Sequence, residues 1–209
     1  TPIPVGTPVI YNANTPLNVT HVSTFPYGYV WSTSTNGSYV FVGEGKVLSI
    51  YTYANLSNPI KISDVVVTSQ IETIISDEYY VYAATLDGLV IIDYSTDVNI
   101  PVIIKMVVPI DHGVYHNDVY YDPYDMKKIG DLIFLGANGY GLAIYNVSTP
   151  LNASEVGWIA NTTLGIDVTS TRVYTGDWTG GFHIYNRTSL TTLSVISSII
   201  STFYTNAPS

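Results

Sequence analysis

Two of the four histidines lie close together in the segment from Asp111 to Asp118, which reads DHGVYHND. His112 and His116, with the two flanking aspartates, could ligate a metal, since imidazole and carboxylate groups suit Zn²⁺ and similar ions. No third strong ligand follows at a fixed spacing. We therefore expect no metal here and favour a polar loop whose histidines bond to backbone groups.

A second candidate is the turn 177–181, DWTGG, in which Trp178 follows Asp177. An exposed Trp could stack on a sugar ring or anchor a partner protein. The sequence therefore offers Asp177 and Trp178 as partner-binding residues. Packing of the indole beneath the turn is the alternative.

Catalytic signatures are absent from the sequence: there is no Gly-x-Ser-x-Gly, His-Glu-x-x-His, phosphate-binding glycine-rich or EF-hand motif. Asp118 and Asp167 are the pair of carboxylates that a repeat fold could gather near a central axis. We predict a protein that is not an enzyme and uses no cofactor. The alternative is a propeller enzyme or metal-dependent binding protein that acts near the axis through Asp118, Asp167 and His116.

Asn-x-Ser/Thr sequons are the most frequent motif. A random placement of 14 Asn and 43 Ser or Thr residues would give about three, and the chain has seven. The excess favours N-glycosylation and passage to an exterior surface. The alternative is that Asn and Ser or Thr occur together in turns. The predicted glycosylation sites are Asn18, Asn36, Asn55, Asn146, Asn152, Asn161 and Asn186.

The composition limits the class of protein. Charged residues make up 11% of the chain, against about 25% in an ordinary soluble domain. The net charge of −9 and seven scattered basic residues exclude a nucleic-acid-binding surface. No Cys is available for disulfides, and no apolar run approaches the ~18 residues of a membrane span. Because the chain starts at Thr1 without Met, we expect a removed leader or a start inside a longer protein.

The elements that must position these residues follow from an internal repeat. A short apolar motif recurs around Ile10, Ile50, Ile92, Ile144 and Ile184, at spacings of 40, 42, 52 and 40 residues. Each period divides into four strand-sized segments, named A to D in chain order, with hairpin signals such as Asp87-Gly88 between them. A period near 40 with four strands is typical of a β-propeller blade.

In the second full period, strands A to D are expected at 71–76, 79–84, 89–94 and 102–108. Strand B recurs at 39–43, 132–136 and 172–176. We attribute the 52-residue spacing to an insertion at 122–130 that lengthens the A–B loop of the third period. The tyrosines that end the C strands are expected to pack between blades, because they recur with the period: Tyr11, Tyr51, Tyr145 and Tyr185.

Two features carry a family resemblance. One is the strand-C motif Leu89-Val-Ile-Ile-Asp93, and the other is an Asp-Val pair, at Asp118 and at Asp167, that precedes a strand such as Val173-Tyr174. On these residues the chain resembles the LVIVD-repeat family of β-propellers. The first two full periods lack the Asp-Val pair. The resemblance implies a propeller fold in an extracytoplasmic setting, and it implies no reaction.

The predicted fold is an all-β, small β-propeller forming a single domain over 1–209. We expect five blades of four strands, with the fifth split between the two ends of the chain. Terminal strands within 1–24 and 199–209 would close the ring or pair with a neighbouring subunit, since an open sheet edge invites association. The alternatives are four blades with exchanged terminal strands, or part of a larger propeller.

Because successive strands alternate in direction, A–B and C–D loops share one face of the disc, and B–C and D–A loops share the other. Six sequons fall at the first face and Asn161 at the second. This placement predicts one sugar-coated face and one nearly bare face where a partner approaches. We therefore predict a non-catalytic, extracellular or cell-surface glycoprotein that self-associates through its terminal strands. It would be a structural subunit of a filament, sheath or surface layer, or an adhesion module.

Overall fold

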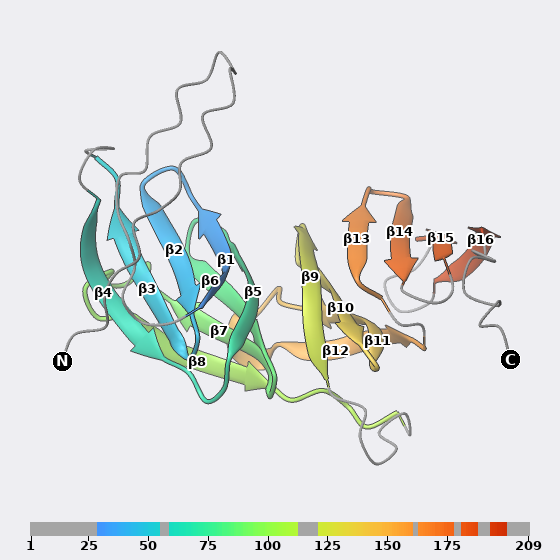
Figure 1. Cartoon of the computed structure of the whole chain (residues 1–209), viewed down its shortest axis with the longest axis horizontal. Coiled ribbons are helices and arrows are strands. Elements are labelled where there is room, and N and C mark those ends of the chain that lie inside the picture. The colour runs from blue at the N-terminus through green and yellow to red at the C-terminus, as the bar shows by residue number, and fades with distance from the viewer. Residues whose placement is uncertain are drawn as a thin grey trace, which may run out of the picture.

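The computed structural model describes residues 29–54, 59–112, 121–160, 163–177, 181–187 and 193–199. These residues form sixteen β-strands and one short 3₁₀ turn, η1 (Pro150–Asn152), and contain no α-helix. The strands make four antiparallel sheets of four, each with its strands side by side in chain order. The sheets follow one another across the molecule, from β1–β4 at the left of Figure 1 to β13–β16 at the right.

Each sheet corresponds to one period of the sequence. Sheet 1 consists of β1 (Val30–Thr35), β2 (Tyr39–Glu44), β3 (Val47–Thr52) and β4 (Ile60–Val66). Sheet 2 consists of β5 (Ile71–Ser76), β6 (Tyr80–Thr85), β7 (Gly88–Asp93) and β8 (Val102–Val107). Sheet 3 consists of β9 (Asp122–Ile129), β10 (Leu132–Asn138), β11 (Gly141–Asn146) and β12 (Ser154–Ile159). Sheet 4 consists of β13 (Gly165–Val168), β14 (Arg172–Asp177), β15 (Gly181–Asn186) and β16 (Ser194–Ile199). The predicted four-stranded repeat is confirmed, and the A to D strands predicted for the second full period match β5 to β8.

The first strand of each sheet is the inner one. β1 contacts β5, β5 contacts β9, and β9 contacts β13. Side chains on one inner strand bond to the backbone of the next: Ser32 Oγ accepts the Ile74 N–H at 3.0 Å, and Asp125 Oδ2 accepts the Ile166 N–H at 2.9 Å. Edge amides that no strand pairs are thereby satisfied between sheets.

The core lies between consecutive sheets, because the two middle strands of a sheet are apolar on both faces. In β7, Val90 and Ile92 pack toward sheet 1, whereas Leu89 and Ile91 pack toward sheet 3. Strands buried on both faces read as continuous apolar runs rather than alternating ones. Tyr145 and Tyr185 are buried between sheets, as predicted. Tyr51 is buried but is in none of the clusters between described sheets, and Tyr11 lies outside the described residues.

The predicted insertion at 122–130 is wrong. Asp122–Ile129 is the inner strand β9 itself, and a tight turn at Gly130 leads directly into β10. The extra residues of the third period lie earlier, between Val107 and Asp122. The polar sequence with Pro123 resembles a loop, but an inner strand has a free edge where Pro is tolerated.

One face of sheet 4 is not covered by another sheet of the described residues. In sheets 1 to 3, the side chains that point to the following sheet are fully buried, as Leu48, Leu89 and Leu142 show. Their counterpart in sheet 4, Phe182, is 39% exposed, and its cross-strand neighbour Ile199 is 67% exposed. We call Tyr174, Phe182, Ile184 and Ile199 the open face. The terminal segments predicted to complete a fifth blade lie outside the described residues, apart from Ile199, and the five-blade ring stays a prediction.

Candidate functional site

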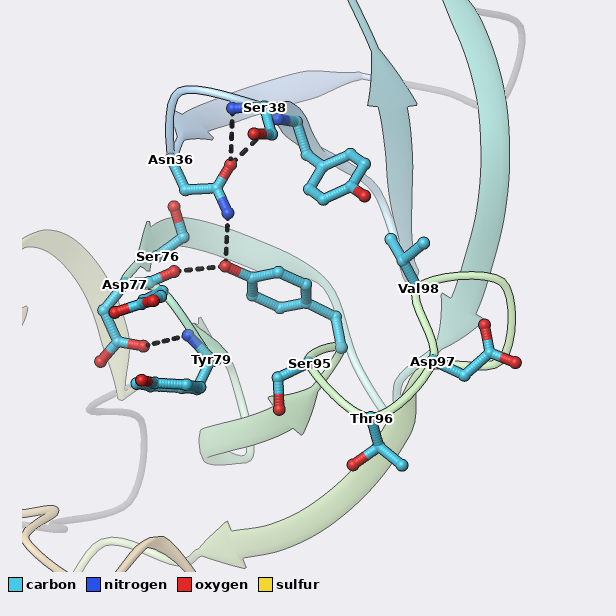
Figure 2. Close-up of a pocket in the computed structure, with 12 residues that line it drawn as sticks. Asn36, Ser38, Ser76, Asp77, Tyr79, Ser95, Thr96, Asp97 and Val98 are labelled. Atoms are coloured by element: carbon cyan, nitrogen blue, oxygen red, sulfur yellow. Dashed lines mark hydrogen bonds between the residues drawn. The ribbon is translucent and has the colours of Figure 1, made fainter.

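A pocket of about 860 Å³ opens between sheets 1 and 2 (Figure 2). It is lined by the A–B turn of sheet 1, the A–B turn of sheet 2 and the C–D loop of sheet 2. We call it the turn pocket. Its lining comprises Asn36, Ser38, Tyr39, Ser76, Asp77, Glu78, Tyr79, Tyr94, Ser95, Thr96, Asp97 and Val98.

Hydrogen bonds across the turn pocket join the two sheets. The Tyr94 hydroxyl donates to the Asp77 carbonyl and accepts a 2.5 Å hydrogen bond from Asn36 Nδ2. Asn36 Oδ1 in turn accepts the N–H groups of Ser38 and Tyr39, at 3.1 and 2.9 Å. Burial raises the pKa of the Tyr94 phenol, with a smaller opposing effect from Asn36. Tyr94 therefore stays a neutral bridge between the two A–B turns.

Asp77 repeats in sheet 2 the part that Asn36 plays in sheet 1. Its Oδ1 accepts the N–H groups of Tyr79 and Tyr80, and Lys128 Nζ of sheet 3 lies 3.1 Å from its Oδ2. Burial alone would raise the pKa of Asp77, but the two backbone donors and the Lys128 ammonium outweigh it and hold the pKa below its usual range. Thr169 Oγ1 caps the equivalent turn of sheet 4.

A second pocket, of about 410 Å³, lies where the inner strands of sheets 1, 2 and 3 begin. We call it the inner-strand pocket. Trp31 and Tyr124 are 60% and 47% exposed there, and Gln70 Nε2 donates to Glu72 Oε1 at 2.8 Å. Its lining comprises Trp31, Gln70, Glu72, Asp122, Pro123 and Tyr124.

The described lining of the inner-strand pocket holds two carboxylates from different sheets and no basic side chain. Burial raises the pKa of Glu72, and the negative charge of Asp122 raises it further. The same Asp122 charge is the largest cause of the raised pKa of the Tyr124 phenol. Neither carboxylate has an ion pair with another described residue. The pocket therefore has unneutralised negative charge beside two aromatic rings.

His112 belongs to a half-buried clamp on the carboxylate of Glu155. Its Nε2 lies 2.6 Å from Glu155 Oε1, and its ring stacks on Trp158 with centroids 4.3 Å apart. The Tyr140 hydroxyl donates to Glu155 Oε2 at 2.8 Å, and the Ile110 N–H lies 3.3 Å from the same oxygen. Both oxygens of this carboxylate are directed at neighbouring groups of the same chain. The clamp fastens the connection after β8 onto β12.

Asp177, His183 and Ser198 form a hydrogen-bonded relay across β14, β15 and β16. His183 Nε2 lies 2.9 Å from Asp177 Oδ2, and His183 Nδ1 lies 2.8 Å from Ser198 Oγ. These are the side chains of a hydrolase triad. Ser198, however, lies on the exposed outer strand, and neither the turn pocket nor the inner-strand pocket borders it. The relay secures β16 to its sheet.

The arrangement of sheets has counterparts among solved structures. The computationally designed Ika4 protein superposes with a TM-score of 0.59 over 80% of this chain and 98% of its own, at 8% sequence identity. The designed Ika8 protein gives a TM-score of 0.60 over 83% of this chain, which spans half of the Ika8 length, at 9% identity. Both are β-propeller-like designs. The fold is propeller-like.

No family model matches the chain. No curated protein matches it by sequence. The solved structures, at 8 and 9% identity, support the repeated four-stranded sheets and nothing finer.

The candidate metal ligands of the segment from Asp111 to Asp118 are only partly described. Asp111 is exposed, and His112 is directed to Glu155 instead. His116 and Asp118 lie outside the described residues. Among the residues that the structure describes, no group of three His, Asp or Glu side chains could hold a metal ion.

Of the candidate partner-binding and axial residues, the structure describes Asp177 and Asp167. Asp177 is buried in the relay, and Trp178 lies outside the described residues. Asp167 is exposed on β13, where its Oδ1 accepts the Val168 N–H. The carboxylates that meet beside the inner strands are instead Glu72 and Asp122. Sequence reasoning missed them because they come from different sheets and no motif links them.

Four of the seven sequons lie in the described residues, at A–B or C–D connections. Asn36 uses its amide nitrogen in the bond to Tyr94, Asn146 Oδ1 accepts the Ser148 N–H, and Asn186 Oδ1 accepts Arg172 Nη1. Asn152 is exposed in η1. Asn18, Asn55 and Asn161 lie outside the described residues. The turn pocket is thus on the face that carries these sequons, and the inner-strand pocket is on the opposite face.

Proposed function

We propose that the chain is a non-catalytic subunit of an extracellular or cell-surface assembly, such as a filament, sheath or surface layer. The observation that carries the proposal is the open face of sheet 4. In sheets 1, 2 and 3, the corresponding face is buried by the next sheet of the same chain. A sheet from a second copy of the chain would cover the fourth.

The outer strands favour association. All six residues of β16 are exposed, and its sequence, SVISSI, has no charge. Ile60 and Val66 of β4 and Val102 and Ile103 of β8 are also exposed. Proteins that remain monomeric usually place Lys, Pro or a bulge on such edges. The uncharged β16 is the type of edge that adds a strand or sheet from a neighbour, whereas β4 carries Lys61 and Asp64 and β8 carries Lys105. An adhesion module remains the alternative use of the same surface.

Membership of the LVIVD-repeat family and N-glycosylation are part of the proposal. The motif Leu89-Val-Ile-Ile-Asp93 occupies β7, a middle strand buried on both faces, where a packing signature is expected. Of the described sequons, Asn152 has the most accessible side chain. Asn36 is the least suitable acceptor, because its amide nitrogen is already bonded in the turn pocket. Glycopeptide mapping of protein from its natural source should find sugar on Asn152 and none on Asn36.

Light scattering and negative-stain images of the purified chain over a range of concentrations test assembly. We expect particles that grow with concentration. A lysine at the open face, F182K or I199K, should leave monomers, because a charge cannot be buried against a second sheet without a partner. S170K places the same charge on an exposed turn of sheet 4 and should assemble normally. A wild-type chain that stays monomeric at every concentration would exclude the proposal, as would F182K and I199K proteins that assemble like S170K.

The alternative of an enzyme or metal-dependent binder near the axis has a different test. Substituting Asp167, with His116 and Asp118, should remove no catalytic or metal-dependent activity if the main proposal holds. A thermal shift on adding EDTA would instead favour the metal-dependent alternative.

A further inference from the structure

We propose that the inner-strand pocket binds an organic cation, with Trp31 and Tyr124 supplying aromatic rings and Glu72 and Asp122 supplying negative charge. The bound group would be an ammonium or guanidinium, carried by a free amine or by a Lys or Arg side chain of a partner. This inference does not depend on assembly of the chain, because the pocket is formed by three sheets of one molecule.

Charge selects the ligand class. Two carboxylates converge from β5 and β9, and among the described residues the lining contains no Lys, Arg or His. Two like charges in one partly buried site oppose each other. A cation removes that repulsion, whereas a neutral ligand such as a sugar would leave it. Electrostatic complementarity of this kind determines which partners are accepted.

The exposed rings select an organic cation rather than a metal ion. Large aromatic side chains do not contribute to the oxygen shells of Ca²⁺ or Mg²⁺, but the face of Trp is the strongest side-chain partner for an ammonium or guanidinium. Trp31 is exposed although an indole of its size would gain by burial. A ligand that covers the ring would recover part of that gain. A volume of about 410 Å³ lies within the usual range for small-ligand sites, about 300–1,000 Å³.

The molecule already uses the same chemistry between its sheets. Lys128 Nζ lies 5.7 Å from the centre of the Tyr82 ring and 3.1 Å from the Asp77 carboxylate. Arg187 Cζ lies 5.3 Å from the centre of the Phe134 ring. In both places a basic side chain of the chain fills a position beside an aromatic ring. The inner-strand pocket has the rings and the carboxylates, and no described side chain supplies the cation.

Titration by calorimetry and by amide NMR, at low ionic strength and pH 7, tests the site. The probes are tetramethylammonium and putrescine as free amines, and N-acetyl-lysine and N-acetyl-arginine methylamides as side-chain mimics. One cation–ring contact and two weak, partly exposed ion pairs should give a dissociation constant of about 1 mM for a singly charged probe. Added salt should weaken binding, because it screens the carboxylates. Stronger binding of the methylamides than of the free amines would assign the ligand to a partner protein.

Variants locate the site. W31A should weaken binding about twofold to fivefold, and E72Q should weaken it while leaving the circular dichroism spectrum unchanged. Y79A and E78Q remove an exposed ring and a charge from the turn pocket and should bind like the wild type. The proposal is overturned if no organic cation binds saturably, if W31A and E72Q bind as tightly as the wild type, or if the turn-pocket variants alone lose binding. Binding of glucose or CaCl₂ in preference to the organic cations would overturn it equally.

Discussion

Single side chains hold the turns of neighbouring sheets together at the turn pocket. Asn36 and Asp77 occupy the same position in successive A–B turns, and each caps two backbone N–H groups with one oxygen. A short side chain with an acceptor oxygen is favoured there because it satisfies donors that the hairpin leaves unpaired. Asn36-Gly-Ser38 is therefore a sequon and a turn at once. The turn chemistry accounts for the spacing of its residues, and glycosylation there stays a prediction.

Replacing Tyr94 by Phe should destabilise the chain. The change removes the hydroxyl that bonds the Asp77 carbonyl and Asn36 Nδ2 while keeping the ring packed on Phe41. We expect a loss of about 1 kcal/mol in the free energy of unfolding, because water in the pocket can replace part of the bonding. Urea denaturation measures it. Tyr79→Phe removes an exposed hydroxyl from the same pocket and should change stability by less than about 0.5 kcal/mol; equal losses in the two variants would contradict the role of Tyr94.

Glu72 should make stability depend on pH in a recognisable direction. Its pKa is raised in the folded chain, so folding favours the protonated form. The stabilisation is complete below the pKa of the unfolded chain, about 4.3, and is lost as pH rises through the folded pKa. Glu72→Gln should therefore be more stable than the wild type at pH 7 and equally stable at pH 3.

Urea unfolding of wild type and Glu72→Gln across this pH range measures the effect. The bond that Gln70 donates can persist in the variant, because glutamine keeps the acceptor oxygen. Glu78→Gln removes the same charge from an exposed turn and separates the effect of the pocket from that of net charge. A Glu72→Gln advantage that does not grow between pH 3 and pH 7 would show that the carboxylate is not penalised by its surroundings.

At the scale of strands, the backbone requires glycine for two different reasons. Gly88 begins β7 with φ of +138°, and a Cβ there would lie 2.3 Å from the Val107 carbonyl oxygen of β8. Gly130, between β9 and β10, has φ of +56° and open space around the Cβ position. At Gly88 a side chain would collide with the backbone of β8. At Gly130 a side chain has room, and only the left-handed backbone conformation disfavours it.

The two alanine variants should consequently differ. Gly130→Ala should lower the free energy of unfolding by about 1–2 kcal/mol, because alanine is strained in the left-handed conformation. Gly88→Ala should cost about 3 kcal/mol or more, because β7 and β8 must separate to admit the methyl group. Denaturant unfolding of both proteins compares them. Similar losses would mean that β8 can move aside, and would place β8 outside the rigid part of the sheet.

The strands that sequence patterns predicted well are the ones whose surroundings are uniform. β6 and β7 are buried on both faces, so their apolar runs and the Asp87-Gly88 turn identify them without knowledge of the neighbours. β9 was missed because its charged residues are satisfied across sheets: Asp125 bonds Ile166, and Lys128 bonds Asp77. Those partners lie about one period away along the chain, where no local pattern shows them.

The same reasoning explains why the inner-strand pocket could not be predicted. Trp31, Glu72 and Asp122 are each ordinary residues near the start of an inner strand. They form one pocket because β1 contacts β5 and β5 contacts β9. The repeat predicted that inner strands exist, but the side chains at their first positions differ from period to period. Their convergence is a property of the assembled sheets.

At the scale of the whole molecule, the sheets are unequally supported. Sheets 2 and 3 are covered on both faces by neighbouring sheets, whereas sheet 4 has the open face and an outer strand, β16, that is exposed along its length. A buried aliphatic side chain contributes about 1.5–3 kcal/mol relative to an exposed one. Sheet 4 should therefore open locally at a lower free energy than sheets 2 and 3.

Amide hydrogen exchange at two protein concentrations distinguishes whether a second copy or the ends of the same chain cover the open face of sheet 4. In dilute protein, β15 and β16 should exchange much faster than β6 and β7, because few apolar contacts oppose their opening. If a second copy covers the open face, β15 and β16 should become protected as concentration rises, and F182K should abolish that gain. If the ends of the chain close a ring instead, β16 should be equally protected at both concentrations. Exchange in β7 serves as the internal reference, since both of its faces are already buried within one molecule.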